Sequence, residues 1–229
     1  MSSSGPNSPG TLADDSAVGG VAWSTPSNAA ASDDSRATAN LTGASGNTHY
    51  LKATNFGFSV SGTIDGILVE IERSANVNSG TREAHDSIVK LVVGGSVVGS
   101  NKATATAYPT TDAYASYGGA ADLWGLTPAD TDINGSTFGV VLSTTYGTGV
   151  SPKAAVQARV DHIRITVYYT AGGPAGQPTS KRFGGVPFMG AHGAGIPSAV
   201  RQWMRRDSGL FAPRQQVATA IWRPAHGID

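Results

Sequence analysis

The sequence predicts an all-β fold: an antiparallel, jelly-roll-like β-sandwich of two sheets, followed by an extended, mostly irregular C-terminal arm with one short helix. Three observations predict this fold. Charged residues make up 14% of the 229-residue chain, against about 25% in an average soluble domain, and 30 residues are Gly. Short apolar runs recur between clusters of Gly, Pro, Asn and Ser, as they do in β-sandwiches. No helical period of apolar positions occurs in residues 1–170.

Seven segments have the composition and alternation of strands. In one of them, Ile67, Val69 and Ile71 alternate with Glu70 and Glu72, which predicts one buried face and one solvated face. We expect strands near residues 37–41, 50–60, 66–74, 86–93, 97–102, 137–144 and 155–170.

The strand predicted at 86–93 is apolar on both faces, because Val89 and Leu91 alternate with Ile88 and Val92. A Gly-Gly pair follows it and predicts a tight hairpin into the next strand.

The last predicted strand has Ile163, Ile165 and Val167 on one face and mainly polar residues on the other. The stretch AGGPAGQP follows at once and supports no regular element. We therefore end the sandwich at Thr170. The chain then has three parts: a flexible N-terminal arm at 1–11, the sandwich at 12–170, and a basic, Gly/Pro/aromatic C-terminal anchoring arm at 171–229.

Four aromatic residues are candidates for the interior of the sandwich. Phe56 and Phe58 bracket Gly57, where the backbone can bend or another chain can approach closely. Trp23 and Trp124 lie in loop-like segments between Pro and Gly. We expect them to close the open ends of the sandwich, with exposed binding aromatics as the alternative.

The charge of the chain is divided between its two large parts. Residues 1–170 hold 9 Lys and Arg against 14 Asp and Glu, a formal charge of −5, whereas residues 171–229 hold 7 against 2, a formal charge of +5. An acidic body with a basic arm predicts attraction to a partner surface, which the body of a neighbouring copy could provide.

Several functional classes are excluded or disfavoured by what the sequence lacks. It has no Cys, so disulfides and thiolate sites are excluded. Its five His form no metal-binding pair, and neither a nucleophile elbow nor a phosphate-binding loop occurs. The start MSSSGPNSPG does not read as a secretory signal, and no apolar run reaches the roughly 18 residues of a membrane span. We expect a soluble, non-secreted protein without catalytic residues or cofactor.

Two patterns could hold a cation. Glu83, His85 and Asp86 are close in sequence, but we interpret them as solvated charges in a polar loop. Asp130, Asp132, Asn134 and Gly135 match the start of an EF-hand loop, whose closing Glu would be replaced here by Val141. We interpret this second pattern as a turn and leave a bound cation open.

The C-terminal arm carries aromatic residues separated by Gly, Pro and Arg. Its one helical stretch is 197–207, where Val200, Trp203 and Met204 form an apolar stripe. We expect these residues to bind a partner, with Trp203 as the central anchor. The candidate partner-binding residues are Arg182, Phe183, Phe188, Met189, Val200, Trp203, Met204, Arg205, Arg206, Phe211 and Trp222.

A series of short motifs runs along the sandwich. It comprises W-S-x-P-x-N-A-x-A-S-D-D at 23–34, YL-x-A-x-x-FGF at 50–58, T-I-x-G-I-x-V-E-I-E-R at 63–73, VVGSNK at 97–102, YGG at 117–119, DLWG at 122–125, D-I-N-x-S-x-FGV at 132–140 and ITVYYT at 165–170. Over residues 12–170, this series resembles a jelly-roll module of structural proteins from tailed bacteriophages.

The resemblance implies a non-enzymatic virion protein, of the capsid decoration type (cement or head fibre) and anchored by its arm. A tail or neck accessory protein stays open, as does an adhesin that stacks Trp23, Trp124 or the tyrosines of 108–117 on a host glycan. Expected partners are the major capsid protein or tail and neck proteins, together with copies of the chain in a homo-oligomer. No membrane partner is expected. Nucleic acid is disfavoured, because the basic residues of the arm are sparse.

Overall fold

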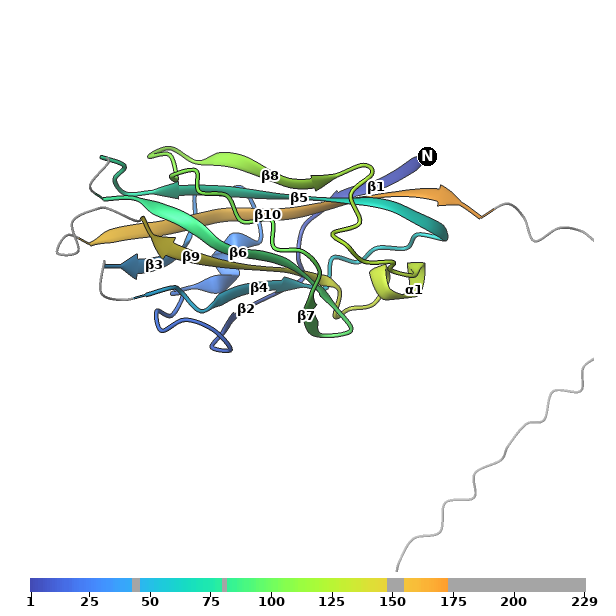
Figure 1. Ribbon diagram of the computed structural model, residues 1–229, viewed down its shortest axis with the longest axis horizontal. Helices are drawn as coiled ribbons and strands as arrows, with labels where there is room; N and C mark the ends of the chain where they lie inside the picture. The colour runs from blue at the N-terminus through green and yellow to red at the C-terminus, as the bar shows by residue number, and fades with distance from the viewer. Residues whose placement is uncertain (43–45, 80–81, 148–154, 173–229) are drawn as a thin grey trace, which may run out of the picture. The chain divides into compact units, whose positions relative to one another are not determined.

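The fold is taken from a computed structural model, which describes residues 1–42, 46–79, 82–147 and 155–172. Ten strands, one 3-10 turn and one short helix occur in these ranges (Figure 1). Within them, no helix is long and apolar enough to cross a membrane. From residue 173 on, the C-terminal arm lies outside the described residues, with its predicted helix and all eleven candidate partner-binding residues.

Two antiparallel sheets face each other across one core, as predicted. The first sheet has the order β1-β10-β5-β8, and β3 pairs with β10 on the same edge as β1. Its strands are β1 (Ser2–Asn7), β3 (Ala37–Leu41), β5 (Gly62–Ala75), β8 (Ala113–Gly119) and β10 (Val156–Ala171).

The second sheet has the order β2-β4-β9-β6-β7. Its strands are β2 (Thr11–Asp15), β4 (Tyr50–Thr54), β6 (Ala84–Val93), β7 (Ser96–Val98) and β9 (Gly139–Tyr146). The turn η1 (Pro26–Ala29) and the helix α1 (Asp130–Ile133) lie in connections. The eight strands from β3 onward form one sheet of order β3-β10-β5-β8 and one of order β4-β9-β6-β7. These two orders are the arrangement of an eight-stranded jelly roll.

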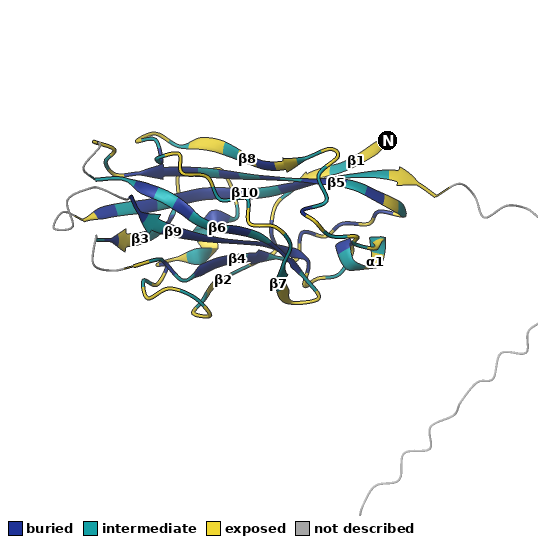
Figure 2. Ribbon diagram, in the orientation of Figure 1, coloured by how far each residue is buried: buried dark blue, intermediate teal, exposed yellow. Residues whose placement is uncertain are grey.

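The core is formed by the apolar face of each long strand (Figure 2). Ile163, Ile165 and Val167 of β10 are fully buried, as are Val140 and Leu142 of β9. Each set recurs at every second residue, which is the period that places side chains on one face of a strand. The predicted inward face of β10 is therefore confirmed.

A β-bulge at Asp161 explains how the whole of β10 contributes to the core. Val156, Ala158 and Val160 are fully buried at even positions, whereas the buried residues further along the strand are at odd positions. The register against β5 shifts between Val160 and His162, so one extra residue reverses the alternation.

A smaller apolar cluster lies apart from the main core. Tyr50, Val92 and Val141 are buried there, with Ile88 and Val97 packed against them. These residues come from four strands of the second sheet, so the two-sided apolar pattern of β6 reflects packing on both of its faces. The Gly-Gly hairpin after β6 is also confirmed: Gly94 and Gly95 have φ values of 58° and 83°, and Val93 pairs with Ser96.

Residues 1–11 differ from the flexible arm that the sequence predicted. β1 pairs with the edge of β10, where Ser2 lies opposite Tyr169, and β2 pairs with β4. Side chains in these segments are mainly exposed, so backbone hydrogen bonds to an already formed strand position them. Composition alone could not indicate such pairing.

Two predicted strands are shorter than expected, and β8 was missed in addition to β1 and β2. The strand predicted at 50–60 ends at Thr54, and the strand predicted at 97–102 ends at Val98. Phe56 and Phe58 are nevertheless buried, with their rings stacked at a centroid distance of 6.3 Å. The bend between them is at Gly57, whose φ is 67°. β8 was missed because AYASYGG has no continuous apolar face.

Both predicted interior tryptophans are buried, so the exposed binding aromatics of the alternative do not occur at these positions. Trp23 Nε1 donates a hydrogen bond of 3.0 Å to the His49 carbonyl oxygen. Trp124 is fully buried, and its Nε1 donates a hydrogen bond of 2.9 Å to the Ile67 carbonyl oxygen. The indole of Trp124 is close to Gly118 of β8, where a Cβ would lie 2.5 Å from Nε1 and 2.3 Å from the Ile67 carbonyl oxygen.

Gly118→Ala should therefore destabilise the fold strongly. The φ of 77° at Gly118 is unfavourable for Ala, and the added methyl group would collide with backbone and indole. We expect a loss of about 2–4 kcal/mol in the free energy of unfolding, measured by urea denaturation. Gly119→Ala is the matched control, because a Cβ there meets nothing within 4 Å. Its effect should stay within about 0.5 kcal/mol, and equal effects of the two changes would contradict this account.

Candidate functional site

An ion pair between the two sheets is the most deeply buried ion pair among the described residues. Arg73 of β5 is 4% exposed, and the side chain of Asp86 of β6 is fully buried. Arg73 Nη1 lies 3.2 Å from Asp86 Oδ1. The guanidinium carbon also lies 4.1 Å from the centroid of the Tyr108 ring, within the range of a cation–π interaction.

Two tyrosines complete this buried network. The hydroxyl groups of Tyr108 and Tyr117 each donate a hydrogen bond of 2.9 Å to the Asp86 carboxylate. Burial, and then the negative charge of Asp86, raises the pKa of both hydroxyls above the ordinary value for Tyr, so both stay protonated as donors. Thr144 of β9 lies 2.9 Å from the Tyr108 hydroxyl oxygen and adds another strand of the second sheet to the network.

The network corrects the interpretation of Glu83, His85 and Asp86 as solvated charges in a loop. Asp86 lies in a strand and points into the core, while His85 Nε2 and Glu83 Oε2 form a half-buried contact of 3.0 Å. A signal for the buried pair was present at Arg73, which has the same alternation phase as Ile71 and therefore faces inward. Arg73 Nε and Nη1 have no hydrogen-bond partner of suitable geometry, so the ion pair and the aromatic ring provide most of the compensation for this charge.

The residues of the EF-hand-like pattern make structural hydrogen bonds. Asp130 Oδ2 accepts a hydrogen bond of 3.0 Å from the Gly62 amide, and Asp132 Oδ2 accepts one of 2.9 Å from the Ala129 amide. Asn134 bonds the amide and the carbonyl oxygen of Val60, at 2.8 Å in each case. These bonds fasten α1 to the segment before β5 and support the predicted structural role.

The outer face of the first sheet carries a row of polar contacts. Arg164 of β10 forms a two-fold hydrogen-bonded pair with Glu70 of β5, at 2.9 and 3.0 Å. Both ring nitrogens of His162 form a hydrogen bond. Nε2 lies 2.8 Å from the Ser8 hydroxyl oxygen, and Nδ1 lies 2.8 Å from the Tyr114 hydroxyl oxygen. Burial, followed by the Arg164 charge, lowers the pKa of His162, which favours the neutral ring near pH 7.

The contact between Ser8 and His162 joins a hydroxyl group to a basic nitrogen, as in nucleophilic enzymes. The second nitrogen of the ring faces the Tyr114 hydroxyl rather than a carboxylate. Ser8 is exposed and follows β1 directly. The arrangement joins the N-terminal segment to β10 and β8.

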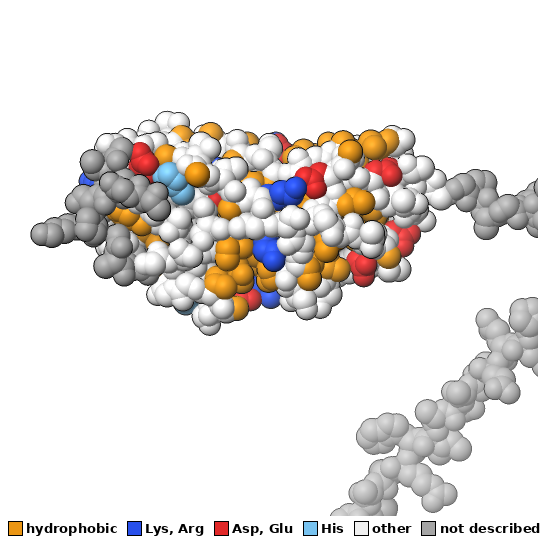
Figure 3. All heavy atoms as spheres, in the orientation of Figure 1, with side chains coloured by type: hydrophobic (Ala, Val, Ile, Leu, Met, Phe, Trp, Pro, Cys, Tyr) orange, Lys and Arg blue, Asp and Glu red, His pale blue; other side chains and the backbone are white. Residues whose placement is uncertain are grey.

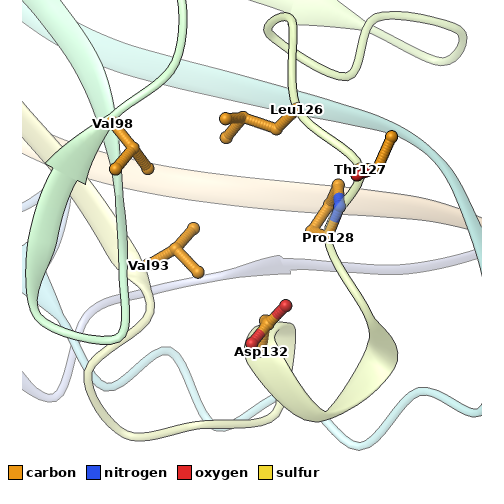
Figure 4. A pocket seen from close by; sticks show the side chains of 6 residues that line it. All are labelled: Val93, Val98, Leu126, Thr127, Pro128 and Asp132. Atoms are coloured by element: carbon orange, nitrogen blue, oxygen red, sulfur yellow. The ribbon is translucent and has the colours of Figure 1, made fainter.

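Two hollows flank the connection at Thr127 and Pro128. The first has a volume of about 270 Å³, and Figure 4 shows Val93 and Val98 of the β6–β7 hairpin facing Leu126 and Pro128 across it. This volume is below the roughly 300–1,000 Å³ of small-molecule sites. The first hollow is lined by Val93, Val98, Leu126, Thr127, Pro128 and Asp132.

The second hollow, of about 350 Å³, lies beside the start of β5 and includes Gly62 and Thr63 in its lining. The last residues of β10 pair with these two residues, because Ala171 lies opposite Gly62 and Thr170 opposite Thr63. The described part of the chain thus ends beside this hollow, whose lining is mainly apolar and includes Asp130. The hollow is a candidate surface for contacts with a partner. On the face of the molecule seen in Figure 3, further hydrophobic side chains lie where β6 and β9 run.

Removing the buried carboxylate should test the network. Asp86→Ala leaves the Arg73 charge unpaired in the core, and we expect a loss of about 3–5 kcal/mol in the free energy of unfolding. Glu83→Ala is the control, because it removes a carboxylate three positions earlier whose side chain is 21% exposed. It should cost about 1 kcal/mol or less. Denaturant titration measures both, and a small effect of Asp86→Ala would show that the pair contributes little.

The chain matches no protein-family model, and comparisons with curated proteins and with solved structures gave no significant match.

Proposed function

We propose that the chain is a non-enzymatic structural protein of a tailed-bacteriophage particle. Its role is that of a capsid decoration protein, of the cement or head-fibre type, anchored by its C-terminal arm. The proposal rests on the sequence motifs that resemble phage structural proteins. The observation that carries it is the position of those motifs in the fold.

The motifs supply scaffold residues of the sandwich. Trp23, Phe56, Phe58 and Trp124 are buried, and the motif at 165–170 is the second half of β10. Such residues specify a fold and carry no chemistry, which agrees with a structural role. Since one fold can serve many functions, the assignment to a virion depends on the resemblance rather than on the sandwich.

Charge supports an arm that binds neighbouring subunits. The arm has a formal charge of +5 and residues 1–170 have −5, so the arm of one copy is attracted to the body of the next or to another acidic virion protein. Aromatic residues along the arm, with Trp203 at the centre, are suited to fill separate pockets on such a partner. The proposed partners are therefore other virion proteins and further copies of the chain.

Deleting residues 171–229 should abolish incorporation of the protein into phage particles. Trp203→Ala should weaken incorporation, because single aromatic anchors contribute about 2 kcal/mol or more at an interface. Immunoblots of purified particles measure occupancy, and circular dichroism checks that the truncated body stays folded. Normal occupancy of the truncated protein would place the contacts on the sandwich instead.

Copy number tests the location within the particle. A decoration protein binds many identical capsomers, so gel densitometry of purified virions should give hundreds of copies. A tail or neck component would be present only in the number needed for one or a few rings. Absence from purified particles would contradict the proposed function as a whole.

A further inference from the structure

Three carboxylates from separate parts of the chain meet beside the bulge of β10. They belong to Asp34 in the connection before β3, Asp112 directly before β8, and Asp161 in β10. One oxygen from each carboxylate lies within 4.8 Å of the others. The Asp34 side chain is 87% exposed and that of Asp112 is 12% exposed, so the cluster reaches from the solvent to the sheet.

Arg36 neutralises only part of this charge. Its guanidinium bonds Asp34 Oδ1 at 3.0 Å and Asp112 Oδ2, through Nε, at 2.8 Å. Ser74 donates a hydrogen bond of 2.6 Å to Asp112 Oδ1. With one guanidinium among three carboxylates, two negative charges remain. Two further charges of opposite sign act on the cluster, Glu72 on Asp161 and Arg159 on Asp112.

Asp161 is the member of the cluster that the protein leaves unsatisfied. Asp161 is 2% exposed, and its Oδ1 is buried without a hydrogen-bond partner. Its Oδ2 accepts one long hydrogen bond of 3.3 Å from the Asp34 amide. The nearby Glu72 Oε2 is also buried without a hydrogen-bond partner.

A buried carboxylate oxygen without a donor leaves the desolvation of its charge uncompensated, and a bound cation would compensate it. We propose that Asp161, together with Asp34 and Asp112, binds a calcium ion. The ligands are hard carboxylate oxygens, and two uncompensated negative charges match a divalent cation. Calcium is favoured over magnesium because it accepts irregular sets of six to eight oxygens, completed here by water at the exposed Asp34 side, whereas magnesium demands a near-ideal octahedron.

A cation at this position would connect three segments that backbone pairing joins only in part. It would hold the connection at Asp34, the start of β8 at Asp112 and the centre of β10 at Asp161. The bulge is what makes this possible, since the extra residue adds a carboxylate to the strand without displacing the apolar side chains on either side of it.

Calcium titration of the full-length protein, first stripped with EDTA, tests the proposal. Isothermal titration calorimetry should detect one calcium site, and thermal unfolding should shift to higher temperature as calcium is added. Asp161→Asn keeps the size of the side chain and removes its charge, and it should weaken calcium binding by at least roughly ten-fold. The variant should still fold in EDTA, which circular dichroism verifies, so that loss of binding is not confused with loss of fold.

Asp65→Asn is the matched control. Asp65 is also an acidic residue at a register shift between β5 and β10, and its Oδ2 accepts a hydrogen bond of 2.8 Å from the Thr170 hydroxyl, but it is outside the cluster. This variant should bind calcium as the unmodified protein does. The proposal is overturned if the unmodified protein binds no calcium at millimolar concentration, if Asp161→Asn binds it equally well, or if both variants lose binding alike.

Discussion

The two-sided pairing of β10 is the constraint on which the rest of the structure depends. This strand pairs with β5 from Ala158 to Ala171, while β1 and β3 share its other edge. Its side chains must therefore be compatible with neighbours on both edges and with the second sheet across the core. β-branched residues at Ile163, Ile165 and Val167 meet that requirement, because they fill the inner face at a spacing of two residues. The position of every other strand in the first sheet follows from its pairing with β10 or β5.

Bulges reconcile this regular pairing with buried polar groups. In β10, the extra residue allows an even-phase apolar run and an odd-phase apolar run to face the same core, and Asp161 lies at the change of phase. β6 has a similar shift between Asp86 and Ile88, and there the carboxylate points into the core. In β10 the extra residue is the acidic Asp161 itself, whereas in β6 it is Ser87, directly after Asp86. Asp86 is compensated by Arg73 and two tyrosines, whereas Asp161 Oδ1 has no partner among the described residues.

The sequence predicted what depends on local pattern and failed where pairing between distant segments decides. Alternation identified seven strands and the inward face of β10, and the Gly-Gly pair identified the hairpin after β6. β1 has no apolar pattern, because its position comes from the free edge of β10. Asp86 begins the predicted strand at 86–93 but was interpreted as a solvated charge, because the bulge puts it out of phase with Val89 and Leu91. The cluster of Asp34, Asp112 and Asp161 could not be recognised, since its members are separated by scores of residues and only the fold brings them together.

The same central strand explains why an anchoring arm would begin where it does. The arm continues directly from β10, which has hydrogen-bonded neighbours on both edges, and not from an edge strand such as β7. A force on the arm along the strand direction would act in shear on the ladder to β5, so many hydrogen bonds would have to yield together. A force on an edge strand would be opposed by one ladder only. A protein held to a particle by its C-terminal segment would gain from this geometry, because tension would be distributed through the first sheet and not concentrated at a single loop.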